Sequence, residues 1–412
     1  MARKMRDSGV EWIGEVPEGW EVLKGKYFFN IQSGWPFDSN LFSNEKGFPL
    51  VRIRDITAGH SETKYLGQYD EAYIIHNEDL LVGMDGDFNV CWWESGAALL
   101  NQRCCRIIHE NGLVKRFIFY AIRFPLYYIN VLAYSTTVKH LSVDDIRDMR
   151  FGMPSIDEID SIVKCLDEKC AAIDGAVDEL KRGIEDCKAW KKAIIFEAVT
   201  GKANVLAAKN ANVAKRQMRD SGIPWIGEIP EGWGMECVKH LFSIGRGRVI
   251  AATEVEQEGY PVYSSQTKNN GLLGYISSYD YDRNQLTWTT DGANAGTVFL
   301  REGKHNCTNV CGTLMPRDDS FSLRFVCYSL GYVTQYERRS DINGFKIMSN
   351  EMAHIKFPLP PLPEQQAIAN YLDEKCAAID ALVAEKEKLI ADLETYKKSL
   401  IFELVTGKRE VA

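Results

Sequence analysis

The feature that most constrains the fold is a stretch of 37 residues that occurs twice. Leu166–Lys202 and Leu372–Lys408 are identical at 22 of the 37 aligned positions. Both copies carry a heptad pattern, which is typical of helices that bury a narrow stripe against each other. At 1.5 Å per residue each helix would be about 55 Å long, too long to be wrapped inside one small domain. The repeat therefore predicts two long helices that pack along a shared seam.

The seam is expected to consist of the apolar heptad positions. They are Leu166, Ile173, Val177, Leu180, Ile184 and Ile194 in the first copy, and Leu372, Ile379, Val383, Ile390, Leu393 and Leu400 in the second. If two copies of one unit pack through equivalent surfaces, the interface is isologous and the helices run antiparallel. Such a coiled coil would hold one globular domain at each end. The alternative is two separate helical hairpins in unrelated domains.

A second repeat gives the two halves of the chain the same plan. Met5–Trp20 returns as Met218–Trp233 with 13 of 16 positions identical. These segments, which we call the openers, are rich in Gly, Pro and Trp, so we expect extended segments fixed by their tryptophans; stacking on a nucleic-acid base is the alternative role. The expected order is an opener (1–20), a variable domain (21–150), a helix with its bridge (151–202), a linker (203–217), a second opener (218–233), a second variable domain (234–356) and a second helix with its bridge (357–408).

The two variable domains share an outline but little sequence. Runs typical of β-strands lie between turn signals, at Pro49–Ile56, Asp79–Met84 and Arg103–Ile108 in the first domain and at Gly259–Ser264, Leu286–Thr290 and Thr297–Leu300 in the second. Each domain also has an Asp-Gly turn, one helical run near its end, and a Lys-x-hydrophobic-Ser turn. We therefore predict an α+β protein with two mixed α/β domains, each dominated by a curved sheet, at opposite ends of the coiled coil.

The ends of the long helices carry their own signals. A proline-containing bridge leads into each helix and places Glu158 or Glu364 in the first turn, where negative charge is favoured. Gly201 and Gly407 lie where a helix C-cap needs a left-handed residue. If the helices are antiparallel, the last residues of the second helix should end near the first opener.

Charge and motifs exclude several classes of function. The net charge is −8, but the variable domains carry only −2 and 0, which predicts weak non-specific affinity for DNA. We find no P-loop, no GxSxG elbow, no HExxH and no GxGxxG after a strand, so the chain does not look like an enzyme by itself. Its 11 cysteines form no CxxC pair, which favours buried free thiols over a metal site. With no long apolar run and no signal-peptide pattern, we expect a cytoplasmic protein without a membrane segment.

Three motifs together resemble the specificity (S) subunits of type I restriction–modification systems. They are DSGxxWIGExPEGW at 7–20 and 220–233, PLPPLPEQ at 358–365, and LDEK…LIFELVTGK at 372–408. The match covers the whole chain in family order. It departs from the pattern in the first bridge, where Ser155 replaces the second proline and Ile159 the glutamine.

The resemblance implies a division of labour. Each variable domain would be a target-recognition domain for one half of a bipartite sequence in duplex DNA, and the helices would set the unread spacer and dock two methyltransferase subunits. The chain itself would hold no cofactor. S-adenosylmethionine would bind to the methyltransferases, and ATP and Mg to the motor–nuclease (restriction) subunits that join them.

Candidate DNA-contacting residues are long polar side chains on expected loops and turns. They are Arg52, Arg54, Lys64, Lys139 and His140 in the first variable domain, and Arg246, Arg248, Gln266, Lys268, Asn269, Asn343 and Lys346 in the second. Arg suits guanine, and Asn or Gln suits adenine, in bidentate major-groove contacts. For each of them an ordinary surface role is the alternative. Two other functions stay open: a scaffold that holds two proteins at a fixed separation, and a self-sufficient DNA methyltransferase.

Overall fold

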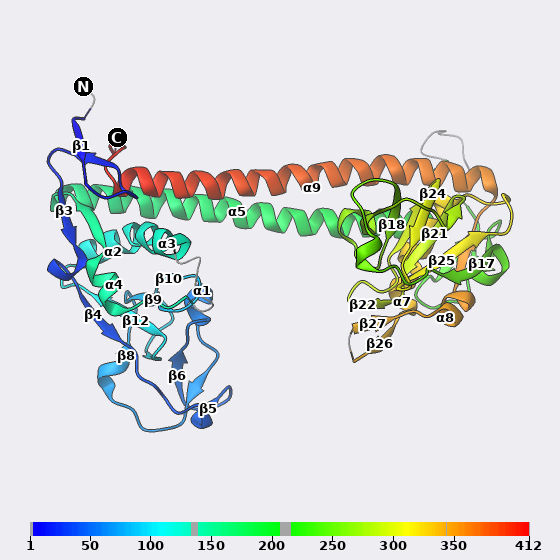
Figure 1. The fold of residues 1–412 in the computed structure, drawn as a ribbon. Coiled ribbons are helices and arrows are strands. Elements are labelled where there is room, and N and C mark those ends of the chain that lie inside the picture. The colour runs from blue at the N-terminus through cyan, green and yellow to red at the C-terminus, as the bar shows by residue number, and fades with distance from the viewer. Residues whose placement is uncertain (1–2, 133–138, 207–215, 343, 412) are drawn as a thin grey trace. The chain divides into compact units, whose positions relative to one another are not determined.

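The structure is a computed structural model that describes residues 3–132, 139–206, 216–342 and 344–411. The chain forms two compact units. Unit 1 comprises Met1–Glu179 and Lys388–Ala412, and unit 2 comprises Leu180–Glu387. Each unit therefore contains one opener, one variable domain and parts of both long helices (Figure 1).

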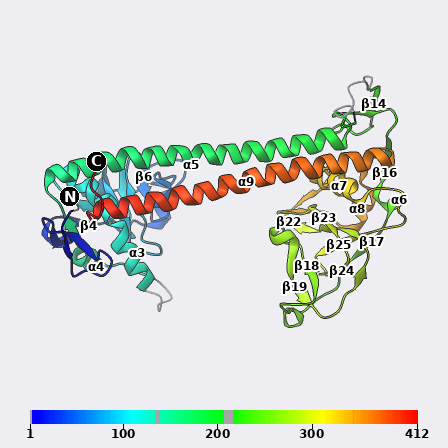
Figure 2. The same cartoon turned by 90° about the horizontal axis from the view of Figure 1, so that it is seen from above.

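The long helices are α5 (Ile156–Val199) and α9 (Leu362–Val405). In unit 2, Lys191 of α5 contacts Asp380 of α9, and a Cβ built on Gly183 would lie 3.2 Å from Nζ of Lys386. Because the residue number rises along α5 while it falls along α9, the helices run antiparallel. In unit 1 the same direction holds, because the start of α5 and the end of α9 both contact the first opener, Glu158 through Trp20 and Lys408 through Ile13 (Figure 1 and Figure 2).

The expected seam residues differ in burial. Those that the structure buries are Leu166, Ile173, Val177, Ile184, Ile194, Leu372, Ile379 and Leu400, while Leu180, Val383, Ile390 and Leu393 are half-buried. A seam between only two helices has no third element to cover it, so water reaches part of these side chains.

Each variable domain is built on two sheets with a matching strand order. In unit 1 the four-stranded sheet has the order β10-β9-β12-β4 and the five-stranded sheet the order β5-β7-β6-β11-β8. The strands are β4 (Asn30–Ser33), β5 (Phe42–Ser43), β6 (Phe48–Val51), β7 (Lys64–Tyr65), β8 (Ile74–Ile75), β9 (Leu80–Gly83), β10 (Val90–Trp92), β11 (Ala98–Leu100) and β12 (Cys104–Ile108).

Unit 2 repeats this plan. Its sheets have the orders β17-β25-β21-β23 and β19-β18-β24-β20, and each unit contains one parallel pair, β6 with β11 and β18 with β24. The strands are β17 (Phe242–Arg246), β18 (Tyr260–Tyr263), β19 (Leu272–Ile276), β20 (Tyr281–Asp282), β21 (Gln285–Thr289), β23 (Val298–Arg301), β24 (Lys304–Cys307) and β25 (Cys311–Pro316). A further three-stranded sheet has the order β22-β27-β26, from β22 (Asp291–Gly292), β26 (Arg339–Asp341) and β27 (Gly344–Lys346).

Seven shorter helices with described bounds lie between the strands or between the strands and the long helices. They are α1 (Asp55–Ala58), α2 (Gly112–Ala121), α3 (Arg123–Leu132) and α4 (Val143–Asp148) in unit 1, and α6 (Val238–Leu241), α7 (Leu323–Glu337) and α8 (Ser349–His354) in unit 2. Each variable domain is closed by one antiparallel pair, β3 (Glu21–Lys24) with β13 (Arg150–Met153) and β16 (Gly234–Cys237) with β28 (Lys356–Leu359). The domain therefore begins and ends at the same place, beside its long helix.

One predicted strand was wrong in its second half. The run Pro49–Ile56 forms a strand only to Val51, and α1 follows at Asp55. The buried carboxylate of Asp55 accepts a hydrogen bond from the backbone N–H of Arg52 at 2.8 Å, which turns the chain away from the sheet. Arg52 and Arg54 consequently lie at a strand-to-helix turn and not in a strand.

The openers are short hairpins and not simply extended segments. β1 (Met5–Asp7) pairs with β2 (Glu15–Pro17), and β14 (Met218–Asp220) pairs with β15 (Glu228–Pro230). The second tryptophan of each opener is buried, with 2% of Trp20 and 3% of Trp233 exposed. Gly201 and Gly407 have φ of +73° and +70°, so both expected left-handed C-caps are confirmed.

Candidate nucleic-acid interface

In unit 1 the Asp-Gly turn lies against the Lys-x-hydrophobic-Ser segment. Asp85 accepts a hydrogen bond from Nδ1 of His140 at 2.7 Å and forms an ion pair with Arg103 at 3.1 Å. The backbone N–H of Gly86 donates to the carbonyl of Lys139 at 3.2 Å. Three segments that are distant in the sequence thus meet here, with Arg103 and His140 on Asp85 and the backbone of Lys139 on Gly86.

In unit 2 the Asp-Gly turn lies against the equivalent Lys-x-hydrophobic-Ser segment, but different side chains make the contacts. Asp291 pairs with Lys346 across β22 and β27, and the N–H of Ile347 donates to the carbonyl of Thr290 at 2.9 Å. Nζ of Lys346 lies 2.7 Å from the carboxylate of Asp341. Arg246, at the end of β17, directs its guanidinium toward Oγ1 of Thr290 at 3.5 Å. Arg246 and Lys346 therefore approach the same turn.

The other candidates of the first variable domain gather around the five-stranded sheet. The exposed Arg54 donates to Oγ1 of Thr63 at 2.9 Å, and the neighbouring Lys64 donates to the carbonyl of Glu45 at 3.0 Å. The guanidinium of Arg52 lies 5.5 Å from the ring centre of Phe42. These three cations form a second basic group, next to the five-stranded sheet and separate from Lys139 and His140.

Arg248 is the candidate whose charge is most fully compensated. Its guanidinium lies 3.0 Å from Asp280 and 3.4 Å from Glu254. Because these carboxylates favour its charged form, the pKa of Arg248 is raised, although burial opposes the shift. A phosphate would have to compete with two carboxylates for this side chain, so Arg248 is a poorer candidate than Arg246.

Gln266, Lys268 and Asn269 lie on one exposed loop between β18 and β19. The loop is joined to the Asp-Gly turn of the same domain, because Nδ2 of Asn294 donates to Oγ1 of Thr267 at 3.2 Å. Asn343 lies outside the described residues. In unit 2 the structure thus connects the loop, the turn and Lys346 into one polar surface.

Two groups of residues were missed by the sequence interpretation. Arg103 was treated only as the start of a strand, although it is the cation that pairs with Asp85. Arg116 and Tyr120 of α2 both bind Asp167 of α5, and Arg324 and Tyr328 of α7 both bind Asp373 of α9. The signal was present, because RFIFY at 116–120 and RFVCY at 324–328 share their Arg, Phe and Tyr.

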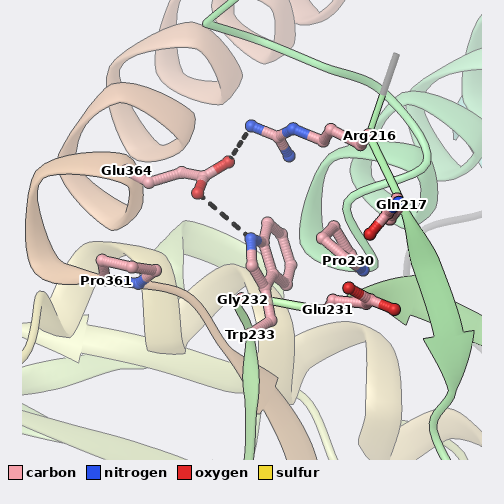
Figure 3. A pocket seen from close by; sticks show the side chains of 8 residues that line it. All are labelled: Arg216, Gln217, Pro230, Glu231, Gly232, Trp233, Pro361 and Glu364. Atoms are coloured by element: carbon pink, nitrogen blue, oxygen red, sulfur yellow. Dashed lines mark hydrogen bonds and ion pairs between the residues drawn. The ribbon is translucent and has the colours of Figure 1, made fainter. Parts of the chain in front are cut away.

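A cavity of about 320 Å³ lies where the second opener meets α9 (Figure 3). Glu364 accepts hydrogen bonds there from the indole N–H of Trp233 at 3.1 Å and from Arg216. Glu158 repeats the arrangement in unit 1 with Trp20 at 2.9 Å and Arg3 at 2.6 Å. The residues that line the cavity come from the end of the linker, the second opener and the bridge into α9, so the cavity lies outside the variable domain.

Among the described residues, no group of three His, Cys, Asp or Glu side chains is placed to hold a metal ion. Burial raises the pKa of several thiols, that of Cys105 to about 12 and that of Cys311 to about 11, which keeps them protonated and unreactive. No helix in the described part of the chain is both long and apolar enough to cross a membrane.

A family model decides what the repeat represents. The model of the type I restriction modification DNA specificity domain matches residues 17–179 and again residues 230–391. The chain belongs to this family. Each match begins inside an opener and ends inside a long helix, so the chain contains two copies of the specificity domain in the two halves that the repeats define.

Individual relatives and one solved structure agree. The chain is 32% identical over 247 residues to the EcoBI type I restriction enzyme specificity subunit of Escherichia coli, a match that covers 60% of this chain and 51% of the relative. It is 34% identical over 165 residues to the MpnII specificity subunit of Mycoplasma pneumoniae, covering 40% of this chain and 49% of the relative. The chain spans about half the length of these relatives. A solved structure from a study of complex assembly and conformational transition of the type I R-M system superposes on this chain with a TM-score of 0.70. The two chains are 16% identical, and the comparison covers 96% of this chain and 99% of the other. This similarity supports the fold.

Proposed function

We propose that this chain is the DNA-recognition subunit of a type I restriction–modification complex. Each variable domain reads one half of a bipartite target in duplex DNA, and the α5–α9 pair sets the spacer between the halves. The observation that carries the proposal is the double match to the specificity-domain model, with one match on each copy of the repeated frame. The openers and the long helices are similar in the two halves, whereas the variable domains differ. This suits a protein whose two variable domains recognise different sequences but are attached to their helices in the same way.

The variable domains supply a surface suited to this role. In unit 1 the side chains of Arg103 and His140 contact Asp85 of the Asp-Gly turn, and Lys139 binds the turn through its backbone carbonyl. In unit 2 the Arg246 side chain contacts Thr290 beside the turn, and the backbone of Lys346 pairs with Asp291. Long cationic and amide side chains supply both the phosphate contacts that position a protein and the base contacts that specify sequence. The neutral net charge of the domains favours a complex in which partners add positive charge.

Catalysis is assigned to the partners. Two methyltransferase subunits would dock on the helical pair and transfer a methyl group from S-adenosylmethionine to adenine. Motor–nuclease subunits would use ATP and Mg. The proposal gives this chain no chemical step, only the selection of the site.

An exchange of one variable domain tests the proposal. Residues 21–150 are replaced by the corresponding domain of another family member, and the chimera is expressed with the methyltransferase. The incoming domain brings its own first strand in place of β3, and this strand should pair with the retained Phe151–Met153 of β13 in the same register. The chimera should therefore fold and should change one half of the methylated sequence only. The control is the reciprocal exchange of 234–356, which should change the other half. Methylation without any sequence preference, or assembly of two proteins with no DNA requirement, would favour the scaffold function instead.

A further inference from the structure

Arg301 is a buried cation that no carboxylate of the described residues pairs with. It ends β23, and only 1% of the residue is exposed. Its Nε donates to Oγ1 of Thr287 at 3.0 Å and its Nη1 to the carbonyl of Asn270 at 2.7 Å, while the rings of Tyr263 and Phe299 cover its faces. All these contacts are neutral, and Nη2 has no hydrogen-bond partner in the described part of the chain. Burial of a charge is unfavourable unless the charge is paired, so this residue needs an explanation.

The fold itself does not require an arginine at this place. The first variable domain has the same strand order, and there Trp92 pairs with Leu80 as Leu300 pairs with Leu286 in the second. The next residue is Trp93 in the first domain and Arg301 in the second, and each is 1% exposed. An apolar ring therefore fills in one domain the position that a cation fills in the other.

The distinctive contact of Arg301 is with the loop Gln266–Gly271, which we call the asparagine loop. Asn269 and Asn270 both adopt left-handed backbone, with φ of +49° and +52°. Asparagine tolerates left-handed backbone better than most residues other than glycine, but usually as a single residue, so two in succession indicate a restrained loop. Arg301 binds the carbonyl of the second of these residues, and a Cβ on Gly271 would lie 2.9 Å from its Nη2. The buried Arg301 side chain thus supports the loop, in addition to the hydrogen bonds of Gln266 with Leu272 and of Ser264 with Gly271.

What the loop presents is polar and exposed. Gln266, Lys268 and Asn269 face solvent, and Thr267 is joined to Asn294 of the Asp-Gly turn, on the side where Lys346 lies. An asparagine amide can bind adenine through two hydrogen bonds in the major groove, and a fixed backbone would hold that amide in place before binding. A flexible backbone would lose part of that discrimination, because the side chain would have to be ordered on binding.

We propose that Arg301 is the positioning residue of a base-contacting loop, in which Asn269 reads an adenine of the second half-site. The inference rests on the proposed function, since it assigns a specificity determinant to the second recognition domain. It makes Arg301 a residue that acts through the loop and not by touching DNA.

The first experiment compares Arg301→Met with Arg283→Met in the full chain. Methionine keeps the length of the side chain but removes its donors and charge, and Arg283 is an exposed arginine of the same domain. Arg301→Met should speed amide hydrogen exchange in Asn269–Leu272 by about tenfold or more, and, with the methyltransferase present, should relax methylation at one or two positions of the second half-site. Arg283→Met should change neither measurement. Equal loss of affinity for random and specific DNA, with discrimination intact, would show a simple charge effect and overturn the proposal.

The second experiment separates the side chain from the backbone and does not depend on the folding of Arg301→Met. Asn269→Gly and Asn270→Gly both suit left-handed backbone, but only the first removes the amide that should read a base. Asn269→Gly should lower discrimination at one position of the second half-site by about tenfold. The loss should exceed that of Asn270→Gly, which adds the same backbone freedom but keeps the carbonyl that Arg301 binds and the amide of Asn269. Unchanged methylation by Asn269→Gly would overturn the inference. If the wild-type chain with its methyltransferase modifies no bipartite site, the proposed function itself fails, before any variant is compared.

Discussion

Nζ of Lys397 lies 2.6 Å from the carboxylate of Asp174, so an ion pair joins α9 to α5 inside unit 1. The same pair recurs inside unit 2, where Lys191 lies 2.6 Å from Asp380. Both lysines interrupt a row of otherwise apolar heptad positions. A polar residue at such a position lowers stability but restricts register and orientation.

We therefore predict opposite effects from two substitutions of Lys397. Lys397→Leu should leave the thermal midpoint unchanged or raise it, because the row becomes fully apolar. Lys397→Asp should lower it by repulsion from Asp174, and Asp174→Lys in the same chain should restore it. The coupling free energy should be about 0.2–1 kcal/mol, as for partly exposed pairs. Circular dichroism melts of the two single variants and the double variant measure it, and additive effects would show that the pair does not interact.

The second prediction concerns the attachment of each variable domain to its helix. The hydroxyl of Tyr120 donates to Asp167 at 2.5 Å, and that of Tyr328 donates to Asp373 at 2.7 Å. Tyr120→Phe or Tyr328→Phe should each lower the free energy of unfolding by about 1 kcal/mol, the typical contribution of one hydrogen bond. Tyr127→Phe is the control, since Tyr127 is 72% exposed. Denaturant titration should separate the two variants from the control; equal midpoints would contradict the role of these contacts.

The third prediction tests the C-cap of α9. A Cβ on Gly407 would lie 2.5 Å from Cδ of Pro17 and 3.1 Å from the Trp20 ring, and its φ is +70°. Gly407→Ala should therefore cost about 1–3 kcal/mol of stability through backbone strain, with the clash added. Gly19→Ala, in the same opener, has no atom within 4 Å of the new Cβ and should be nearly neutral. Similar melting curves for the two variants would refute the packing described here.

The fourth prediction concerns affinity for DNA. Because the variable domains carry net charges of −2 and 0, the isolated chain should bind random duplex weakly, with a shallow dependence on salt. Sequence preference should develop when the methyltransferase is added. Titration by fluorescence anisotropy at several salt concentrations checks both points. Tight, specific binding by the chain alone would contradict them.

The fifth prediction uses the position of the chain ends. Nζ of Lys408 donates to the carbonyl of Ile13 at 2.7 Å, so the end of α9 lies against the first opener, as expected from antiparallel helices. A permutant that joins Ala412 to Met1 and opens within 203–217 should fold and specify the same site, with a short added linker if needed, because exposed linkers tolerate new termini. Its melting curve and methylation pattern decide the matter: failure to fold even with the added linker would contradict the arrangement.

Sequence reasoning succeeded where the chain repeats itself. The two copies of the opener and of the long helix showed which residues form the parts common to both halves. Glu158 and Glu364 lie in the first turns of these helices, as predicted. The sequence did not reveal that these carboxylates also bind Trp20 and Trp233. The position of an acidic residue near the start of a helix does not specify which distant residue it contacts.

The variable domains share little sequence, so no internal repeat helped to predict their structure. The strand run after Pro49 was overextended because Asp55 turns the chain through a hydrogen bond that no periodicity encodes. The contact of Arg301 with Asn270 spans 31 residues and has no counterpart in the other half, where Trp93 takes its place. Contacts of this kind depend on which loops the sheets bring together, and a single sequence does not specify that.

The core of unit 1 has a consequence for synthesis on the ribosome. Trp20, Phe117 and Leu166 share that core with Leu400, Ile401 and Leu404, which are translated more than 200 residues later. Unit 2 is continuous from Leu180 to Glu387, so all its parts have left the ribosome before unit 1 receives its last ones. Unit 1 begins to be synthesised first but can complete its core only after unit 2 has been synthesised. Until then the apolar seam residues of α5 in unit 1 stay exposed and can bind chaperones or a neighbouring nascent chain.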